Sequence, residues 1–329
     1  MEPGSPYAPV LAWFIRMART VVTLTLNPAL DIAASVQKLI PDRKLRCEDI
    51  RRDPGGGGIN VARVIHRLGG NVTAIFPCGG VTGKIICERL TAEGTPFHAV
   101  PVAGETRENF NVIDRAAGQQ YRFIFPGSAL ATTDWQACLD NAIALVEPGD
   151  YLVGSGSLPP GVPEDFYALM ARAAQSKGAH AVVDASGPAL RGLGLQIVHL
   201  LKTSLSEMSE LVGRPLPDLD AWKQACMDVI SRGKAEHVAL SLGPHGALLA
   251  SGNQFWRAAA PEMHSTNAVG AGDSFLGALA WMLAGGAAPA EALPYAVAAG
   301  SAAMLSSGTG LCDRPHAEQL AKEIVVERL

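Results

Sequence analysis

The stretch "DPGGGGINVARVIHRLGGNVTAIFP" (residues 53–77) joins a glycine run, a helical pattern and a short apolar strand pattern. Apolar residues recur at helical spacing from about Ile59, whereas "VTAIFP" has the β-branched apolar character of a buried strand. The same two patterns alternate along the chain. Strand patterns recur at residues 20–26, 151–157, 180–186, 237–243 and 246–250, and helical patterns at 163–178 and 220–235. This alternation predicts an α/β fold with a mostly parallel, buried central sheet and helices on both faces.

Two stretches interrupt the alternation, residues 31–53 and 104–127. Within the second, "ENFNVIDRAAGQQYRFIF" predicts a β-hairpin that turns at Ala117-Gly118. We expect the two stretches to form one small sheet that projects from the core as a lid or a dimer surface. The core would then comprise residues 17–30, 54–103 and 128–329. Residues 1–16, which precede Met17, are interpreted as a dispensable extension or the product of a misplaced start codon.

The composition narrows the class of protein. The chain has 329 residues, of which 48% are hydrophobic and 18% charged, as expected of a compact enzyme. A net charge of -4 argues against nucleic acid or an anionic membrane as the partner. The six cysteines are scattered without metal-ligand spacing, which favours reduced thiols and a cytoplasmic location. The apolar stretch "APVLAWFI" near the start is too short to span a bilayer.

A second glycine-rich turn lies in "NAVGAGDSFLGALA" (residues 267–280), directly before a helical pattern. Asp273 has two interpretations at this point. It can be an ordinary N-cap, since Asp is a preferred capping residue. Alternatively, the N–H groups of the turn and the positive helix end bind an anion beside the carboxylate. The stretch alone leaves both open.

The first glycine run, Gly55 to Gly58, is longer than a turn requires, which suggests that a ligand presses against its backbone. Common nucleotide signatures fit poorly. In "CGGVTGKI", Cys78 stands where a P-loop has its first glycine, and Ile85 follows the lysine where Ser or Thr is needed. In "GAGDSF", Phe275 replaces the third glycine of a dinucleotide fingerprint, so a dehydrogenase is a weak alternative.

Six motifs together resemble one family in order and spacing. They are "TLTLNPALD", "KLRC", "PGGGGINVAR", "GSGSLPPG", "SLGPHGAL" and "VGAGDS". From about Arg19 onward, the chain resembles the ribokinase-like (PfkB-type) carbohydrate kinases. "KLRC" and "PGGGGIN" resemble the 6-phosphofructokinase branch in particular. The resemblance implies a ribokinase-like three-layer core with a small β-sheet lid, and a homodimer formed through that lid.

The activity that the resemblance implies is phosphorylation of fructose 6-phosphate to fructose 1,6-bisphosphate in glycolysis, with ATP and Mg²⁺. Three basic residues in the lid stretches favour a phosphorylated sugar, because burying a dianion without cations is costly. Fructose 1-phosphate and tagatose 6-phosphate remain rival substrates. A catalytically silent sugar-phosphate binding protein is the alternative from a different class.

The resemblance also assigns roles to residues. Asp273 would be the base that accepts the sugar hydroxyl proton, with the backbone of Gly270, Ala271 and Gly272 stabilising the transferring phosphoryl group. This chemistry depends mainly on positioning and electrostatics, which a helix N-terminus beside a carboxylate supplies. The residues expected to hold the sugar are Asp31, Gly56, Gly57, Asn60 and Ser157. Those expected to neutralise its phosphate are Lys44, Arg46 and Arg107, the first two of which could instead serve a neighbouring subunit.

On the nucleotide side the resemblance points to Lys202, Ser204, Ser241, Gly243, Gly246, Ala303 and Ser307. The segment "AAGSAAMLSSGTG" would close over the adenine. Glu207 would meet Mg²⁺ through water. A monovalent cation such as K⁺ would be held by carbonyl groups near Asn267, Val269, Ala303 and Gly308.

Two departures from the family pattern stand out. The family's "KPNxxE" reads "KTSLSE" at residues 202–207, so Ser204 replaces an Asn that helps to order waters around Mg²⁺. We therefore expect a raised requirement for free Mg²⁺, unless a further water fills the space. The second departure is Gly310, where the 6-phosphofructokinase branch has Arg.

Overall fold

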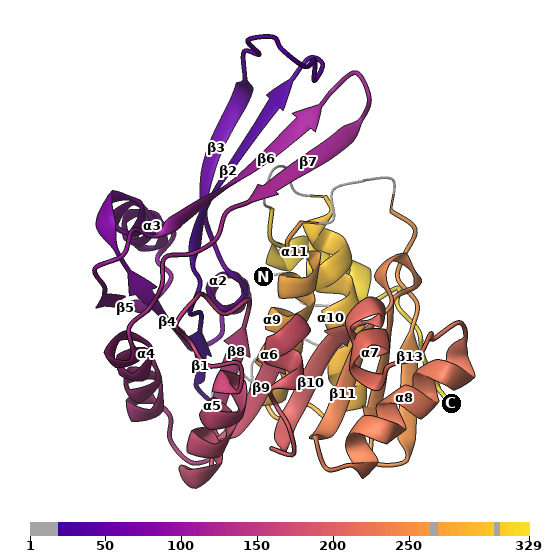
Figure 1. Ribbon diagram of the computed structural model, residues 1–329. Helices are drawn as coiled ribbons and strands as arrows, with labels where there is room; N and C mark the ends of the chain where they lie inside the picture. Colours follow the sequence, from indigo (N-terminus) through magenta and orange to yellow (C-terminus); the bar gives the residue numbers. More distant parts are fainter. Residues whose placement is uncertain (1–18, 264–268, 306–309) are drawn as a thin grey trace.

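The computed structural model describes residues 19–263, 269–305 and 310–329, which form a layered α/β body and a projecting lid (Figure 1). The body contains a ten-stranded sheet in the order β14-β13-β12-β11-β10-β9-β8-β1-β4-β5. Seven neighbouring strands of this sheet are parallel. They are β1 (Val21–Leu24), β4 (Val72–Cys78), β5 (Phe97–Pro101), β8 (Tyr151–Ser155), β9 (His180–Asp184), β10 (Val198–Ser204) and β11 (Ala235–Ser241).

Three antiparallel strands complete the sheet beyond β11. They are β12 (Ala247–Ser251), β13 (Gln254–Ala258) and β14 (Val326–Arg328). The one-turn 3₁₀ helix η1 (Gly243–His245) lies between β11 and β12. The chain therefore turns back at residues 243–246, just beyond the carboxyl end of β11.

Helices cover both faces of the sheet, and each face has its own apolar core. One face packs against α2 (Gly57–Arg67), α9 (Ala271–Ala284), α10 (Pro289–Ala303) and α11 (Arg314–Ala321). The other packs against α4 (Thr132–Leu145), α5 (Phe166–Ser176), α6 (Gly187–Arg191), α7 (Leu205–Val212) and α8 (Leu219–Ser231). The strands are nearly continuous apolar runs because they are buried on both sides.

The lid is a separate four-stranded sheet in the order β3-β2-β6-β7. Its strands are β2 (Ala29–Val36), β3 (Glu48–Gly55), β6 (Arg107–Asp114) and β7 (Gln119–Ile124). Helix α3 (Gly80–Glu93) packs against β2 and β3 where the lid joins the body. Because β2 and β3 begin and end beside the body, residues near Asp31 and Gly55 lie at the base of the lid.

The predicted fold class is confirmed, with corrections of detail. The pattern "GALLA" forms β12, which is antiparallel and not part of the parallel set. Strand β10 was missed because its sequence "VHLLKTS" carries His and Lys, which masked its apolar run. The hairpin β6–β7 turns at residues 115–118, as predicted. Helix α2 begins at Gly57 rather than near Ile59, so two of the four glycines are helical.

The described helices include none with the length and apolar character that crossing a membrane requires. Residues 1–16, whose role was predicted above, lie outside the described part of the chain.

Candidate active site

Asp273 lies in the first turn of α9, and the N-cap residue of that helix is Gly270, which adopts φ 78°. The Asp273 carboxylate accepts a hydrogen bond from Nδ2 of Asn60 on α2, at 2.9 Å. The capping interpretation of Asp273 is therefore wrong, because the side chain faces a neighbouring helix and a glycine occupies the cap position.

Asn60 is held in one orientation by a buried arginine. The Arg63 guanidinium donates to Oδ1 of Asn60 at 3.3 Å and to the Pro54 carbonyl at 2.9 Å, and it pairs with Glu93 at 2.6 Å. A guanidinium can only donate, so the amide oxygen of Asn60 must face Arg63. The amide NH₂ group is thereby directed at Asp273. The carboxylate position is set by a chain of contacts that reaches from α3 through α2 to α9.

Burial raises the pKa of Asp273 to about 6, although the Asn60 hydrogen bond favours the charged form. The nearby Asp184 carboxylate adds to the increase, and Lys202 opposes it. A carboxylate with this pKa is mostly ionised at neutral pH and still accepts a proton more readily than an ordinary Asp. These are the properties of a general base.

Lys202 and Asp184 form an ion pair at the carboxyl ends of β9 and β10, where they are directly paired in register. The Lys202 Nζ lies 3.0 Å from each Asp184 carboxylate oxygen, and Lys202 is only 7% exposed. Burial on its own would lower the pKa of Lys202, but the carboxylates of Asp184, Asp273 and Glu207 raise it above its ordinary value. Lys202 is therefore a permanent cation.

This cation stands next to the N-terminus of α9. A Cβ atom on Gly272 would lie 3.3 Å from the Lys202 Nζ, so the ammonium group faces the turn closely. The first N–H groups of the helix, which have no partner within the helix, its dipole and the ammonium group are thus concentrated at one point. Such an arrangement suits a polyphosphate anion.

Ser204 and Glu207 form a capping box on α7. The Glu207 carboxylate accepts hydrogen bonds from the Ser204 backbone N–H at 2.8 Å and from its hydroxyl at 2.7 Å. In the "KTSLSE" segment, the side chains of Ser204 and Glu207 thus cap the N-terminus of α7. Glu207 nevertheless remains close enough to Asp184 to raise its pKa.

The other residues predicted to bind the nucleotide differ in their contacts and surroundings. The Ser241 hydroxyl donates to the Thr203 carbonyl at 3.3 Å, between the ends of β10 and β11. Gly243 adopts φ 59° and a Cβ there would meet open space, whereas a Cβ on Gly246 would lie 2.0 Å from the Ala258 carbonyl oxygen. Gly246 therefore has a packing role. Ala303 is buried in the last turn of α10 and Val269 precedes the Gly270 turn, but Asn267, Ser307 and Gly308 lie outside the described residues.

The first glycine run is enclosed by the protein itself. An added Cβ would lie 2.3 Å from the Asp31 carboxylate at Gly55, 2.2 Å from the Ser155 hydroxyl at Gly57, and 2.5 Å from the Thr25 hydroxyl at Gly58. Gly56 adopts φ 109°, which other residues rarely reach. Packing therefore accounts for all four glycines, and their number is not by itself evidence of a ligand.

Three polar residues meet at the base of the lid. The Asp31 carboxylate accepts a hydrogen bond from Asn109 Nδ2 at 2.8 Å, and burial raises the pKa of Asp31 while Arg107 and Arg122 lower it. The Arg107 guanidinium donates to the carbonyls of Phe125 and Asn27, at 2.9 and 3.1 Å. Its Nε is buried without a hydrogen-bond partner among the described residues.

The remaining predicted sugar residues separate into two groups. Ser157 accepts a hydrogen bond from Asn27 at 3.0 Å and so lies beside the Arg107 contacts. Lys44 and Arg46 are exposed in the loop between β2 and β3, at the outer end of the lid (Figure 1). Within one chain, the structure does not bring them to Arg107.

Sequence reasoning missed Asp184, Asn109, Arg122 and Ser155. Asp184 had a usable signal, because it ends an apolar run and the carboxyl ends of parallel strands carry the functional groups of such sheets. Asn109 and Arg122 lie on lid strands whose alternation gave no reason to prefer them over their neighbours. Ser155 acts through its contact with the glycine run, which only the packing reveals.

The fold and this site define a ribokinase-like kinase, and comparison with known proteins agrees. The profile of the pfkB family carbohydrate kinases matches residues 22–317. The chain is 42% identical to the ATP-dependent 6-phosphofructokinase isozyme 2 of Escherichia coli over 91% of this chain and 97% of that protein. It is 31% identical to the 1-phosphofructokinase of Xanthomonas campestris over 94% and 98% of the respective chains.

A solved structure of the Escherichia coli phosphofructokinase-2 in complex with potassium has a TM-score of 0.89 and 41% identity. The match covers 93% of this chain and 99% of that one. The chain belongs to the pfkB family of carbohydrate kinases.

Proposed function

We propose that the protein is a 6-phosphofructokinase, which transfers the γ-phosphoryl group of ATP to the free primary hydroxyl of fructose 6-phosphate. The observation that carries the proposal is the buried Asp273 carboxylate, whose pKa is about 6, in the first turn of a helix that starts at a glycine beside Lys202. The branch follows from identity, 42% to the 6-phosphofructokinase against 31% to the 1-phosphofructokinase.

In this proposal Asp273 accepts the hydroxyl proton as the sugar oxygen attacks phosphorus. The backbone N–H groups of Ala271 and Gly272 stabilise the negative charge on the transferring group, and Lys202 stabilises charge on the nucleotide phosphates. Each of these groups is fixed before the reaction, since the carboxylate is held by Asn60 and the ammonium by Asp184. Preorganisation of this kind is how enzymes lower the barrier to phosphoryl transfer.

For the sugar phosphate, Arg107 is the principal cation at the base of the lid. Its two terminal nitrogens are engaged by carbonyls, but its buried Nε lacks a partner among the described residues. Asp31, fixed by Asn109, would accept hydrogen bonds from sugar hydroxyls. A solved structure of the Escherichia coli relative holds fructose-6-phosphate, which supports this class of substrate.

The excess of carboxylates over cations suits a divalent ion that accompanies ATP. Asp184, Asp273 and Glu207 all influence the single ammonium group of Lys202. Carboxylates and water are the ligands that Mg²⁺ prefers, and bound Mg²⁺ would neutralise charge on the phosphates. Asp184 and Glu207 would hold it. A K⁺ site near Val269 and Ala303 is proposed by analogy with the potassium complex of the relative.

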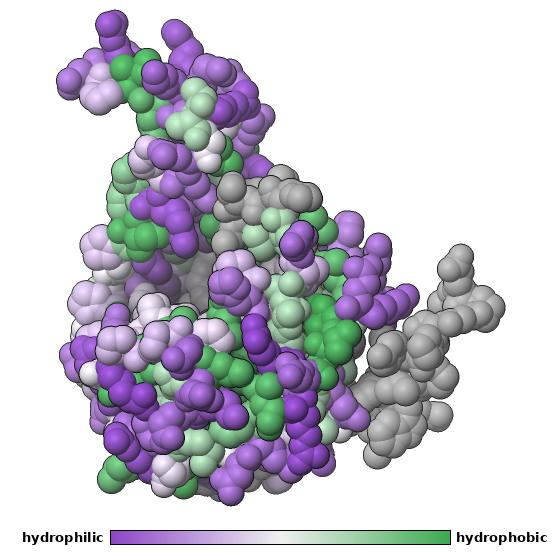
Figure 2. Space-filling model, turned by 90° about the vertical axis from the view of Figure 1, so that its right-hand side faces the viewer, coloured by the Kyte–Doolittle hydropathy of each residue, from purple (hydrophilic) through white to green (hydrophobic). Residues whose placement is uncertain are grey.

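We further propose that the chain forms a homodimer through the lid. Large apolar side chains are exposed there, including Ile50, Phe123, Ile124 and Phe125, and Figure 2 shows apolar residues among the polar ones on the lid. Exposed apolar groups on a narrow sheet favour burial against a second copy. A partner's Lys44 and Arg46 would then approach the sugar site. The Escherichia coli relative has a tetrameric inhibited form, so sedimentation analysis with and without ATP is the appropriate test.

All six cysteines are free thiols, which is in keeping with a reducing cytoplasmic location.

The proposed reaction is tested by following ADP formation with fructose 6-phosphate, fructose 1-phosphate, tagatose 6-phosphate and fructose. We expect the highest kcat/KM with fructose 6-phosphate, and we expect Arg107→Ala to raise KM for that sugar far more than KM for ATP. A higher kcat/KM with fructose 1-phosphate would overturn the assignment of fructose 6-phosphate as the substrate. Binding of the sugar phosphates without turnover would favour the alternative of a catalytically silent binding protein.

A further inference from the structure

A row of aromatic and imidazole rings lies across the amino-terminal ends of four strands of the central sheet. The ring centres of Tyr151 and His180 are 4.9 Å apart, those of His180 and His199 4.3 Å, and those of His199 and His237 4.9 Å. These residues stand at or near the first positions of β8, β9, β10 and β11. Asp184 and Lys202 lie at the other ends of β9 and β10. The row therefore lies at the amino-terminal ends of the strands, and the candidate active site lies at their carboxyl ends.

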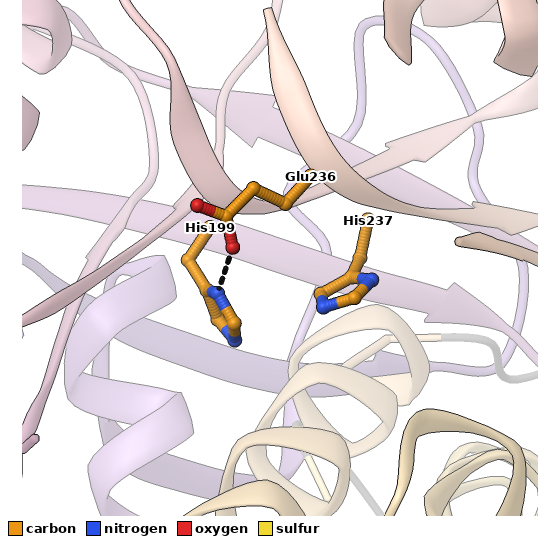
Figure 3. Close-up of side chains that lie close together, drawn as sticks. All are labelled: His199, Glu236 and His237. Atoms are coloured by element: carbon orange, nitrogen blue, oxygen red, sulfur yellow. Dashed lines mark hydrogen bonds and ion pairs between the residues drawn. The ribbon is translucent and has the colours of Figure 1, made fainter. Parts of the chain in front are cut away.

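Two of the histidines face a carboxylate. One possible ligand atom from each of His199, Glu236 and His237 lies within 4.8 Å of the other two. The His199 Nδ1 is 2.7 Å from a Glu236 carboxylate oxygen. Figure 3 shows both imidazole rings on the same side of their strands, with the Glu236 carboxylate turned toward His199.

The strand register explains why His199 and Glu236 meet. Val198 pairs with Ala235 and Leu200 with His237 across the parallel strands, so His199 stands opposite Glu236. Neighbouring strands lie about 4.7–4.9 Å apart, so the side chains of these two opposed residues are within reach of each other. Backbone pairing therefore fixes His199 beside Glu236. His237 is the next residue of β11, and although consecutive side chains of a strand alternate in direction, one of its ring nitrogens still lies within 4.8 Å of the other two ligand atoms.

His237 has an unsatisfied group at this point. Its Nδ1 is buried and has no hydrogen-bond partner among the described residues. Leaving a buried polar nitrogen unpaired costs about 1–3 kcal/mol, so such an atom calls for an explanation. A ligand that accepts the lone pair of a neutral imidazole would satisfy it.

We propose that His199, Glu236 and His237 bind a divalent transition-metal ion of the Zn²⁺ class. Two imidazoles and one carboxylate are a common protein ligand set for Zn²⁺, with water completing the tetrahedron. Ions of the Mg²⁺ class prefer sites built from oxygen alone, so this site is chemically distinct from the one proposed for MgATP. The ion would cross-link β10 to β11. The proposal does not depend on the proposed function.

The test uses the full chain without an affinity tag, freed of metal by a chelator and then titrated with Zn²⁺ in competition with a chromogenic chelator. We expect one Zn²⁺ per chain and a higher melting temperature in its presence, because ligands that bind only the folded state stabilise it. Co²⁺ should give the visible absorption of a four- or five-coordinate ion. Loss of an outer partner alone costs about 10–100-fold in metal affinity, so His199→Gln and His237→Gln should each weaken binding at least tenfold.

A matched control lies elsewhere in the chain. His316 Nδ1 is also 2.7 Å from a carboxylate, that of Asp313, but among the described residues it belongs to no group of three possible metal ligands. His316→Gln should leave Zn²⁺ affinity unchanged. Cys78 and Cys87 place their sulfur atoms 3.6 Å apart and are therefore a competing candidate for the Zn²⁺ ligands. If the histidine site binds the ion, Cys87→Ser must retain full affinity. The proposal is overturned if the wild type takes up no Zn²⁺, if the double variant His199→Gln/His237→Gln keeps its affinity, or if Cys87→Ser loses it.

Discussion

The two glycine turns, Gly55 to Gly58 at the start of α2 and Gly270 to Gly272 at the start of α9, are similar in sequence and differ in their surroundings. Around the first, atoms of Asp31, Ser155 and Thr25 lie within 2.5 Å of the places where Cβ atoms would stand. Around the second, a Cβ on Gly270 would lie 2.9 Å from the Gly310 carbonyl oxygen, whereas a Cβ on Gly272 would meet, among the described residues, only the end of the Lys202 side chain, at 3.3 Å.

The comparison shows that a glycine marks a close approach without saying what approaches. The first turn lets strands and a helix pack closely, and the second places the start of a helix beside a cation. Anion binding depends on the open N–H groups and the charge, not on the number of glycines. Variants that alter the two turns separately should therefore have different consequences.

The largest effect should come from removing the cation that distinguishes the second turn. Lys202→Met leaves the Asp184 carboxylate buried without its partner, and breaking a buried pair in this way costs about 3–5 kcal/mol. We expect that loss in the free energy of unfolding, measured with urea, together with a large increase in KM for ATP. As a control, Asp228→Asn breaks the more exposed pair with Arg214 and should cost about 1 kcal/mol or less. Equal losses would contradict the importance of burial.

Gly272→Ala tests the open turn. The new methyl group should be tolerated, because the flexible end of Lys202 is the one neighbour within 4 Å among the described residues and Gly272 does not require a positive φ. It would nevertheless project to where the phosphoryl group approaches the backbone. We expect kcat to fall roughly 100-fold, the amount that loss of one charge-stabilising donor costs. The melting temperature should be unchanged, and a variant with full activity would show that no anion approaches this backbone.

Gly57→Ala tests the enclosed turn. Its Cβ would lie 2.2 Å from the Ser155 hydroxyl and 3.0 Å from the Ser155 carbonyl carbon, so β8 or α2 must move. Overpacking of this kind costs about 1–3 kcal/mol. We expect a lower free energy of unfolding from chemical denaturation, with the kcat of the folded fraction reduced less than in Gly272→Ala. Unchanged stability would mean that the space around this turn is larger than the structure shows.

The start of α7 offers a third comparison, because side chains close it. Ser204→Ala removes the cap and should cost about 1 kcal/mol, whereas Ser204→Asn retains a capping residue and should cost little. Thermal unfolding of both variants checks this order. The expectation that Ser204 raises the Mg²⁺ requirement stays a prediction. A Mg²⁺ titration at fixed MgATP tests it, with a lower half-saturating concentration expected for Ser204→Asn and superimposable curves contradicting it.

Much of the fold was predictable, because buried parallel strands and amphipathic helices leave clear periodic patterns. The strand that carries Lys202 was missed because polar residues lie near both of its ends and leave only a short apolar run at its centre. The direction of β12 could not be read either. An apolar run gives burial but not orientation, which here is set by the turn at residues 243–246.

The site was predictable where a motif carried it and unpredictable where it depended on distant contacts. Asp273 and Asn60 were both identified, and the structure places them 2.9 Å apart. That Arg63 fixes the Asn60 amide, and that Asp184 neutralises Lys202, follows only from packing across several elements. The number of glycines in the first turn has a packing explanation that sequence could not give, because sequence does not reveal which of the protein's own atoms lie nearby. That a ligand also contacts this turn stays a prediction.

The central claim is that Asp273 acts as a base and not as a structural acid. Asp273→Asn preserves shape, and it should not lower the melting temperature at pH 7. The reason is that the pKa of Asp273 is raised by burial from 3.8 to about 6, so the stability it contributes is present below 3.8 and is lost as pH rises through about 6.

The most direct measurement is kcat with fructose 6-phosphate and MgATP for the wild type and Asp273→Asn, together with the pH profile of wild-type kcat/KM. Because the base must be ionised, the wild-type kcat/KM should fall as pH drops below about 6. The variant should lose at least roughly 100-fold in kcat and should bind both substrates within a few-fold of the wild type. A variant that is folded and keeps a tenth or more of the wild-type kcat would contradict the claim.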